Sequence, residues 1–486
     1  MVVAGMTLPP LSPEVFDSLP SAVQVYIRAL EAVVAQQAQR IIHLEAQVVT
    51  LTARVAELEA KLKMNSSNSS QPPSSDGPHA KPAPPRTPSG KKRGGQHGHP
   101  KHERTLLPPD EIHDHKPERC RRCCTKLNGD DPDPIIDQVL ELPVKLRHVI
   151  HHRRHRLTCP HCQTTNTAAV PPEAVSGFGP KLTAVTAYLS GVARQGKRAI
   201  STFFGEVCAI PMAIGSVSKL EAKVSKALAT IHDEALQHAQ GQDANVDETG
   251  WKQGSKKAWL WVAVTNLLTV FLIRPQRNRA AFDDLVGPKP GILTTDRYSV
   301  YTHLAGDKRQ VCWAHLRRDF QAMIDRQNAG TIIGEGLLLH ADILFDHWQN
   351  VRDGTRTRRW FERQQVSWLR NEVRLLLERG SACGCALTAR VCRDILTVEV
   401  SLWMFASAAG VEPTNNAAER AVRHAVCWRK TSYGTDSERG SRFVERLLTV
   451  VASCRSQGRS VLEFLTQAVS TQCDHPQKLS LIPDVV

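Results

Sequence analysis

The sequence Ala244-Asn-Val-Asp-Glu-Thr-Gly-Trp251 opens the part of the chain that decides the fold. Three further segments rich in β-branched and aromatic residues follow it, and a helix is expected over residues 279–286, before the last of them. Short apolar runs of this composition predict β-strands. The predicted strands are 244–247, 258–265, 268–274 and 291–295.

A ribonuclease-H-like α/β fold begins in this order, with three strands joined as hairpins, then a helix and a fourth strand. In that arrangement Asp247 lies on the first strand near the sheet centre, and Asp296 follows the end of the fourth strand. Two carboxylates that are distant in sequence would then be neighbours in space. They form half of a magnesium site, because Mg²⁺ prefers oxygen ligands and keeps several waters, so that few carboxylates are needed.

A third carboxylate is expected from a helix that packs against this sheet. Residues 415–426 predict such a helix, with Asn415 at its N-cap and small apolar residues on one face. Glu419 lies in its first turns, and Glu445 is the chief rival for the role. Glu248 is the weaker candidate, because neighbouring strand residues point to opposite faces. Each acid alone is typical of a surface or ion-paired carboxylate, whereas three in these settings predict paired Mg²⁺ (or Mn²⁺) ions and phosphodiester chemistry.

The catalytic domain is expected over residues 241–435, with a C-terminal helical extension over 436–486. About 120 residues separate Asp296 from Glu419, which is more than a compact fold needs. A helical insertion is therefore expected over about 331–409. Its arginine-rich helices and three tryptophans are expected to cover the active site or to contact DNA. These tryptophans are Trp348, Trp360 and Trp368.

The charge balance favours a polyanionic partner. The chain has 486 residues, a formal net charge of +14 and a pI near 9.3, which indicate several domains and either nucleic acid or an anionic membrane surface as partner. The most apolar stretch, Trp259–Ile273, is about fifteen residues long, short of the roughly twenty that cross a bilayer. Because the N-terminus lacks a secretory pattern, a cytoplasmic, nucleoid-associated protein with no membrane partner is expected.

Four of the thirteen cysteines have the spacing of metal ligands. Cys120 and Cys123 form one Cys-x-x-Cys pair, and Cys159 and Cys162 form another. Two such pairs supply the four thiolates of a structural Zn²⁺ site. A small zinc-binding module is therefore expected over residues 106–175.

Residues 135–157, between the two pairs, alternate in hydrophobicity and predict strands that connect them. Cys124 and His161 are rival ligands for the metal. The alternative to a zinc site is two redox-sensitive thiol pairs in a loop.

Residues 1–64 are expected to form a coiled-coil oligomerisation helix. Apolar residues recur over almost five heptads, and β-branched side chains at most a positions favour a parallel dimer. Gln37 interrupts the d row. The alternative is a long amphipathic helix that folds back on its own chain. The rows are Val34, Ile41, Val48, Val55 and Leu62 at a, and Leu30, Leu44, Leu51 and Leu58 at d.

The segments around the cysteine pairs are basic or helical. Residues 65–105 have the Pro, Ser and Gly content of a disordered basic linker. Two basic runs, 91–99 and 147–156, are either solvated surface or sequence-independent phosphate contacts. Residues 176–240 predict a helical DNA-binding region, in which 200–220 match either a helix-turn-helix or a plain helical core.

These motifs resemble transposases of the insertion sequence 66 family, members of the Asp-Asp-Glu transposase superfamily. The resemblance takes in nearly the whole chain, from the coiled coil to four sequence blocks. It implies that Asp247, Asp296 and Glu419 carry catalysis and that the four paired cysteines bind zinc. The chain departs from the family at Cys124 and Arg297, where glycine is usual. The blocks are Val246-Asp-Glu-Thr-Gly250, Thr295-Asp-Arg-Tyr298, Cys312-Trp-Ala-His-Leu-Arg-Arg-Asp-Phe320 and Asn415-Asn-Ala-Ala-Glu-Arg-Ala-Val-Arg423.

The resemblance also implies partners and a reaction. The protein would bind the terminal inverted repeats of an insertion sequence and target DNA, cleave strands, and join the freed 3' ends by two-metal phosphoryl transfer. A homo-oligomer through the coiled coil and accessory proteins of the same element are further partners. His315, Arg317 and Arg318 are expected near DNA, with a structural histidine and solvated arginines as the alternative. Two other classes are a catalytically inactive or domesticated zinc-containing DNA-binding regulator and a zinc-stabilised scaffold.

Overall fold

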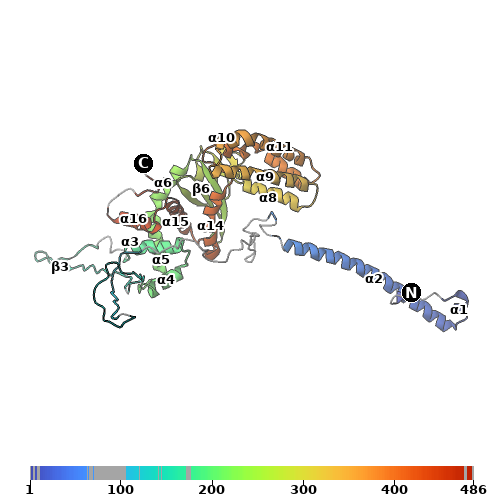
Figure 1. The fold of residues 1–486 in the computed structure, drawn as a ribbon, viewed down its shortest axis with the longest axis horizontal. Helices are drawn as coiled ribbons and strands as arrows, with labels where there is room; N and C mark the ends of the chain where they lie inside the picture. Colours follow the sequence, from blue (N-terminus) through green and yellow to red (C-terminus); the bar gives the residue numbers. More distant parts are fainter. Residues whose placement is uncertain are drawn as a thin grey trace. The chain divides into compact units, whose positions relative to one another are not determined.

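The computed structural model describes residues 2–3, 6–7, 11–62, 64, 69–70, 106–119, 121–140, 142–143, 145–170, 177–474 and 479–483. The chain divides into two compact units, residues 1–84 with 318–334, and residues 85–317 with 335–486. Helices, a five-stranded mixed sheet and a two-stranded hairpin are the described elements of the larger unit (Figure 1).

The smaller unit contains one long helix, α2 (Ser21–Leu62), of 42 residues. A short helix, α1 (Pro13–Asp17), and an antiparallel pair, β1 (Val2–Val3) and β2 (Met6–Thr7), precede it. The apolar rows expected at the coiled-coil seam lie on this helix, and each described side chain of the rows from residue 30 to 58 is at least 38% exposed. The helix is confirmed, and its pairing with a second chain stays a prediction.

The cysteine-containing segment has little regular structure. One hairpin is formed by β3 (Arg156–Thr158) and β4 (Thr165–Thr167), and a single bridge joins Arg119 to Lys126. The prediction of strands over 135–157 is wrong for its described residues before 156, which belong to no strand. Their apolar side chains are exposed, as at Ile135 (94%), so no second layer buries an alternating face there.

Four helices precede the sheet: α3 (Pro180–Gly191), α4 (Lys197–Glu206), α5 (Ile214–Ala227) and α6 (Ala229–Ala239). The helices α4 and α5 are the pair that the sequence offered as a helix-turn-helix. Ile200 and Phe204 of α4 share a small core with Val217 and Leu220 of α5. This core holds the two helices together, and a role in DNA binding stays a prediction.

The sheet has the order β7-β6-β5-β8-β9. Its strands are β5 (Ala244–Gln253), β6 (Lys256–Val264), β7 (Thr269–Arg274), β8 (Leu293–Thr295) and β9 (Arg309–Val311). The first three pair antiparallel, whereas β8 and β9 run parallel to β5. The four predicted strands are confirmed, and β5 is central, as expected. The helix α7 (Arg279–Val286) also lies where the sequence predicts it.

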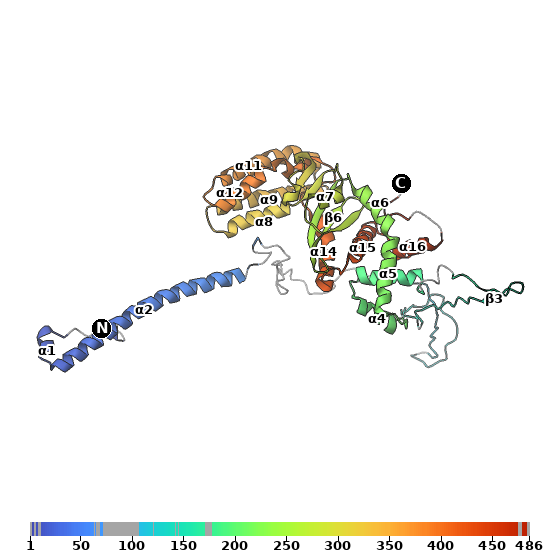
Figure 2. The ribbon, with the colours of Figure 1, turned by 180° about the vertical axis from the view of Figure 1, so that it is seen from behind.

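Different helices cover the two faces of the sheet (Figure 2). Phe282 of α7 contacts Trp261, whose register partner on β5 is Glu248. The helix α14 (Asn416–Ser432) lies on the other face, since Arg429 donates to Thr249 Oγ1 at 3.3 Å. Asp247 shares the face of Thr249, because strand residues two apart point the same way.

Polar side chains of the helix α15 (Glu438–Ser456) close the outer edge of β7. The three acceptors are spaced four residues apart, so they form one row on the helix. This row satisfies backbone donors that an edge strand otherwise offers to other chains. The N–H groups of Thr269, Phe271 and Ile273 donate to Ser453 Oγ at 3.0 Å, Thr449 Oγ1 at 3.0 Å and Glu445 Oε2 at 2.8 Å.

The residues between β9 and α14 are helical, as predicted. Trp348, Phe361 and Phe405 stack with ring centroids 4.9–5.8 Å apart. Trp348 is only 2% exposed, so the expectation that it contacts DNA is wrong, because it is a core residue. The helices are α8 (Trp313–Asp325), α9 (Thr331–Arg352), α10 (Arg358–Phe361), a π-helix (Glu362–Val366), α11 (Ser367–Ser381), α12 (Ala386–Leu396) and α13 (Met404–Ser407).

The helix α16 (Val461–Asp474) follows α15. Short 3₁₀ turns at Ser299–Tyr301, Gly306–Lys308 and Glu399–Leu402 complete the described elements. Among the helices that the structure describes, none combines the length and the apolar character that crossing a bilayer requires.

Candidate active site

Asp247 and Asp296 are brought together by the parallel pairing of β5 with β8. The register pairs Ala244 with Leu293 and Asn245 with Thr294. Extended two residues further, just past the end of β8, this register would set Asp296 beside Asp247, since paired strands lie about 4.8 Å apart, and the Asp296 carboxylate does act on the pKa of Asp247. The sequence interval of 49 residues between these acids is thus closed by the sheet itself.

The backbone around Asp296 is held by a buried arginine. Arg309, 1% exposed, donates from Nη2 to the Asp296 carbonyl at 2.8 Å and from Nε to Thr295 Oγ1 at 3.1 Å. Burial lowers the pKa of Arg309 to about 10, and the Asp296 carboxylate opposes that shift. The N–H of Tyr298 donates to Asp296 Oδ1 at 2.9 Å, which forms an Asx turn. Asp296 therefore has a defined orientation after the strand end.

Glu419 is positioned by the loop that precedes α14. Asn415 is fully buried, and its Nδ2 donates to the Val246 carbonyl, next to Asp247, at 2.7 Å. In the first turn of the helix, the N–H of Glu419 donates to the Asn415 carbonyl at 3.1 Å. Asn415 is the N-cap residue, as predicted, but its side chain makes no capping bond.

Three further hydrogen bonds join the same loop to β5 and to the start of α8. They link segments that are at least 100 residues apart in sequence. Because each bond uses a backbone group, they fix the path of the chain on both sides of Asp247 and Glu419. Asn245 Nδ2 donates to the Thr414 carbonyl at 3.2 Å, the Asn415 N–H to Cys312 Sγ at 3.1 Å, and the Trp313 N–H to the Pro413 carbonyl at 2.9 Å.

The electrostatics of Asp247 reflect its acidic neighbours. Burial, followed by the charge of Glu248, raises the pKa of Asp247 from 3.8 to about 8. The carboxylates of Asp296 and Glu419 raise this pKa further. Both candidate partners are therefore within electrostatic range of Asp247. Carboxylate oxygens of this kind fit Mg²⁺ or Mn²⁺, which would also relieve their mutual repulsion.

Glu248 serves a different network on the opposite face of β5. Its Oε1 accepts from Arg277 Nε at 2.9 Å, and its Oε2 accepts from the Tyr301 hydroxyl. The Arg277 guanidinium lies 4.8 Å from the Trp259 ring and 3.6 Å from the Tyr298 ring. Glu248 is thus already paired, in agreement with its lower ranking from the sequence.

Glu445 is not a candidate for the third carboxylate. Its side chain is 2% exposed, and Oε1 accepts from Arg442 Nη1 at 2.6 Å while Oε2 accepts from the Ile273 N–H. Ile273 is on β7, two strands away from β5. Glu445 therefore stabilises the sheet edge.

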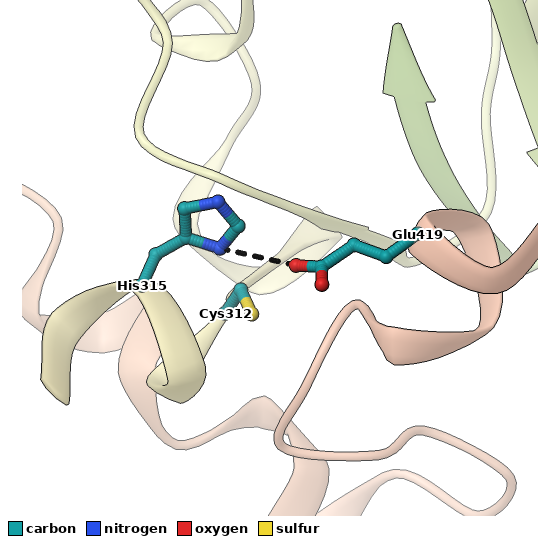
Figure 3. A group of neighbouring side chains, drawn as sticks. All are labelled: Cys312, His315 and Glu419. Carbon is teal, nitrogen blue, oxygen red and sulfur yellow. Dashed lines mark ion pairs between the residues drawn. The ribbon is translucent and has the colours of Figure 1, made fainter. Parts of the chain in front are cut away.

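His315 contacts the third acid. Its Nδ1 lies 3.5 Å from Glu419 Oε1, and Cys312 is beside them (Figure 3). Cys312, His315 and Glu419 form the one cluster of three potential metal-ligating side chains found within the described residues. The sequence block Cys312-Trp-Ala-His315 drew attention to the histidine as a DNA contact, but it could not indicate Glu419 as its partner.

The zinc ligands are only partly described. Cys120 lies outside the described residues, and Cys123 does not form a close three-ligand cluster with Cys159 and Cys162 in the described part of the chain. Cys159 and Cys162 lie in the β3–β4 turn, where the Cys159 N–H donates to the Thr164 carbonyl at 2.9 Å. The hydrogen bond between Cys162 Sγ and Thr164 Oγ1, at 3.4 Å, lowers the pKa of Cys162, which favours the thiolate that zinc needs.

Cys124 has a backbone conformation that explains the glycine usual at this position. Its φ is 57°, in the left-handed region that glycine occupies most readily. The turn after Cys123 is therefore strained by a β-carbon.

Comparisons with known proteins assign most of the described sheet and helices to a family. The family described as "Transposase IS66 family" matches residues 177–442, which include Asp247, Asp296 and Glu419. A family of unknown function (DUF6444) matches residues 17–105. A relative described as "Uncharacterized protein y4qI", from Sinorhizobium fredii (strain NBRC 101917 / NGR234), is 28% identical over 240 residues. This match covers 44% of the present chain and 43% of the relative's length.

Proposed function

Since the chain belongs to the IS66 family of transposases, we propose that it cleaves DNA at the terminal inverted repeats of an insertion sequence and joins the 3' ends to target DNA. The observation that carries this proposal is the hydrogen-bonded loop that holds Glu419 next to the strand of Asp247. The raised pKa of Asp247 supports it, because perturbed acids cluster at functional sites.

We assign catalysis to Asp247, Asp296 and Glu419. When bound, a pair of Mg²⁺ or Mn²⁺ ions activates the attacking water or 3'-hydroxyl and stabilises the leaving oxygen. Asp247 on β5, Asp296 just after β8 and Glu419 in the first turn of α14 would provide the oxygen ligands. No covalent enzyme intermediate is needed. The sheet order and the placement of the acids support a ribonuclease-H-like catalytic domain.

DNA contact is supported by arginines of the helical insertion. Arg358, Arg359 and Arg363 line a pocket together with Glu362. Arg358 holds the fold, since its Nη1 donates to the Ala408 carbonyl at 2.7 Å. Arg359 and Arg363 are exposed and take part in no ion pair in the portion of the chain that the structure describes. They suit phosphate oxygens, which bind arginine without reading base sequence.

The zinc site remains part of the proposal. Cys120, Cys123, Cys159 and Cys162 would provide four thiolates for one structural Zn²⁺. Elemental analysis of the purified chain should find one Zn²⁺ per polypeptide, and Cys159→Ser should remove most of it. Full-length protein that carries no zinc, yet is folded and active, would exclude the site. Accessory proteins of the same element stay expected partners.

A strand-transfer assay with a plasmid that carries the terminal inverted repeats tests the function. We expect Asp247→Ala, Asp296→Ala and Glu419→Ala each to lose roughly a thousandfold or more in rate, because a metal ligand supports several kcal/mol of transition-state stabilisation. Asp394→Ala is the matched control, since Asp394 is exposed on α12. Binding of inverted-repeat DNA should survive all four changes.

Two results would reject catalysis. Equal activity of the wild type and the three variants would exclude these acids. Specific DNA binding by a wild type that never cuts would leave an inactive or domesticated regulator as the function.

A further inference from the structure

The contact between His315 and Glu419 joins two parts of the candidate site. His315 lies in the first turn of α8, where its N–H donates to the Cys312 carbonyl at 3.2 Å. Its Nδ1 is 3.5 Å from Oε1 of Glu419, on the first turn of α14. The side chains are 29% and 38% exposed, respectively. The two contacting atoms, His315 Nδ1 and Glu419 Oε1, are themselves buried, whereas other parts of both side chains are open to a bound cation or DNA.

Cys312 does not suit a metal site in this cluster. It is 0% exposed, and its sulfur accepts the N–H of Asn415 at 3.1 Å. Burial raises the pKa of Cys312 to about 11, whereas a metal ligand must be a thiolate. Cys312 therefore holds the loop before α14, and the chemistry of the cluster rests on His315 and Glu419.

The three proposed acids differ in how firmly they are held. Asp247 has a short side chain on a central strand, and Asp296 accepts the N–H of Tyr298. Glu419 lies on the helix α14, and its side chain has one more rotatable bond than that of either aspartate. Mg²⁺ demands near-octahedral geometry, so a freely rotating carboxylate is a poor ligand. Hydrogen-bonded partners are the usual means of orienting ligating carboxylates.

We propose that His315 is a positioning residue for Glu419, and this inference rests on the proposed function. His315 holds Oε1 of the carboxylate and leaves Oε2 to a divalent cation. A direct bond from the imidazole to Mg²⁺ is less suitable, because Mg²⁺ prefers oxygen ligands. The histidine thus connects the start of α8 to the third metal ligand.

Mn²⁺ binding to the full-length protein without DNA tests this role, with the free ion measured by electron paramagnetic resonance. We expect His315→Ala to weaken Mn²⁺ binding about 10- to 100-fold, the range for lost partners of metal ligands. His315→Asn should restore much of the affinity, since its Nδ2 lies close to the position of the imidazole Nδ1. His340→Ala is the control. His340 lies on α9 and its ring bonds the Gly336 carbonyl of the same helix.

A double-mutant comparison separates positioning from direct ligation. In a Glu419→Gln background, His315→Ala should cause no further loss of Mn²⁺ affinity. A similar loss in both backgrounds would show that His315 acts independently of Glu419 and would overturn the inference. An unchanged Mn²⁺ affinity in folded His315→Ala would overturn the inference as well. So would evidence that Cys312 binds the metal, namely a thiolate-to-metal absorption band with Cd²⁺ that disappears in Cys312→Ser.

The outcome is separable from the proposed function. If Mn²⁺ binding shows the coupling but strand transfer is absent, the proposed function fails and the positioning role stands. If strand transfer depends on the three acids but the coupling is absent, only the role of His315 is lost.

Discussion

Asp247 combines burial with three acidic neighbours, and both raise its pKa. Its pKa is raised from 3.8 to about 8, so the metal-free protein keeps a proton on Asp247 at neutral pH. Because the folded state binds this proton more tightly than the unfolded state, the metal-free fold loses stability as the pH rises from about 4 to about 8. A divalent cation must displace the same proton.

The displaced proton predicts a pH dependence of metal binding. The apparent affinity for Mn²⁺ should increase by about tenfold per pH unit below about 8 and level off above it, because Asp247 releases its one proton when it binds Mn²⁺. Titrations of Mn²⁺ at several pH values measure this slope. Asp247→Asn is the control, since it should bind more weakly and lose the slope. An affinity that is constant from pH 6 to 8 would contradict the shifted pKa.

The candidate acids could be predicted from the sequence, because each lies in a recognisable local pattern. Asp247 is within a strand pattern, Asp296 follows one, and Glu419 lies in the first turn of a predicted helix. The contact with His315 could not be predicted, because it depends on hydrogen bonds between the loop before α14 and the start of α8. Those bonds use backbone groups and a buried thiol, which leave no periodic signal.

At the level of elements, Glu445, Thr449 and Ser453 on α15 form a row beside β7. This row accepts the backbone hydrogen bonds that a neighbouring strand would otherwise accept. Each residue accepts one backbone N–H of the edge strand. Read from the sequence, Glu445 looked like a rival catalytic acid, because helical position alone does not reveal which face meets the sheet. Its actual partner is a backbone donor.

Removing one acceptor from this row should destabilise the fold. Thr449→Val keeps the shape of the side chain and leaves the Phe271 N–H buried without an acceptor, which costs about 1–3 kcal/mol of unfolding free energy. Urea unfolding of the full-length protein measures the change. Thr466→Val is the matched control, because the Thr466 hydroxyl only donates to the Leu462 carbonyl of its own helix. Equal stability of the two variants would contradict the role of the row.

The predictions over residues 135–157 and at Trp348 failed for related reasons. The alternating pattern of the first region indicates strands only where a second layer buries one face, and none of its described apolar residues is buried. The sequence leaves Trp348 as a residue that covers the active site or contacts DNA, because large aromatic residues occur both on surfaces and in cores. Its packing on Phe361 and Phe405 depends on helices distant in sequence.

For the whole molecule, the exposed rows of α2 predict self-association. A helix of 42 residues with an exposed apolar seam gains from pairing with a second copy, because apolar surface leaves water. Ile41→Glu with Val48→Glu should convert the oligomer to a monomer in sedimentation velocity experiments. Ala46→Glu with Ala53→Glu, at f positions of the heptad, is the control and should leave the oligomer intact. A wild type that sediments as a monomer would contradict the coiled coil.

The central claim is that Asp247, Asp296 and Glu419 together hold the catalytic cations. Anomalous X-ray diffraction from crystals of the full-length protein with inverted-repeat DNA and Mn²⁺ tests it most directly. The account predicts Mn²⁺ peaks at about 2 Å from carboxylate oxygens of all three residues, as for similar hard cations. Two results would contradict it. In a complex that can cleave DNA, the Mn²⁺ ions could be bound by other residues, or the three carboxylates could contact no ion.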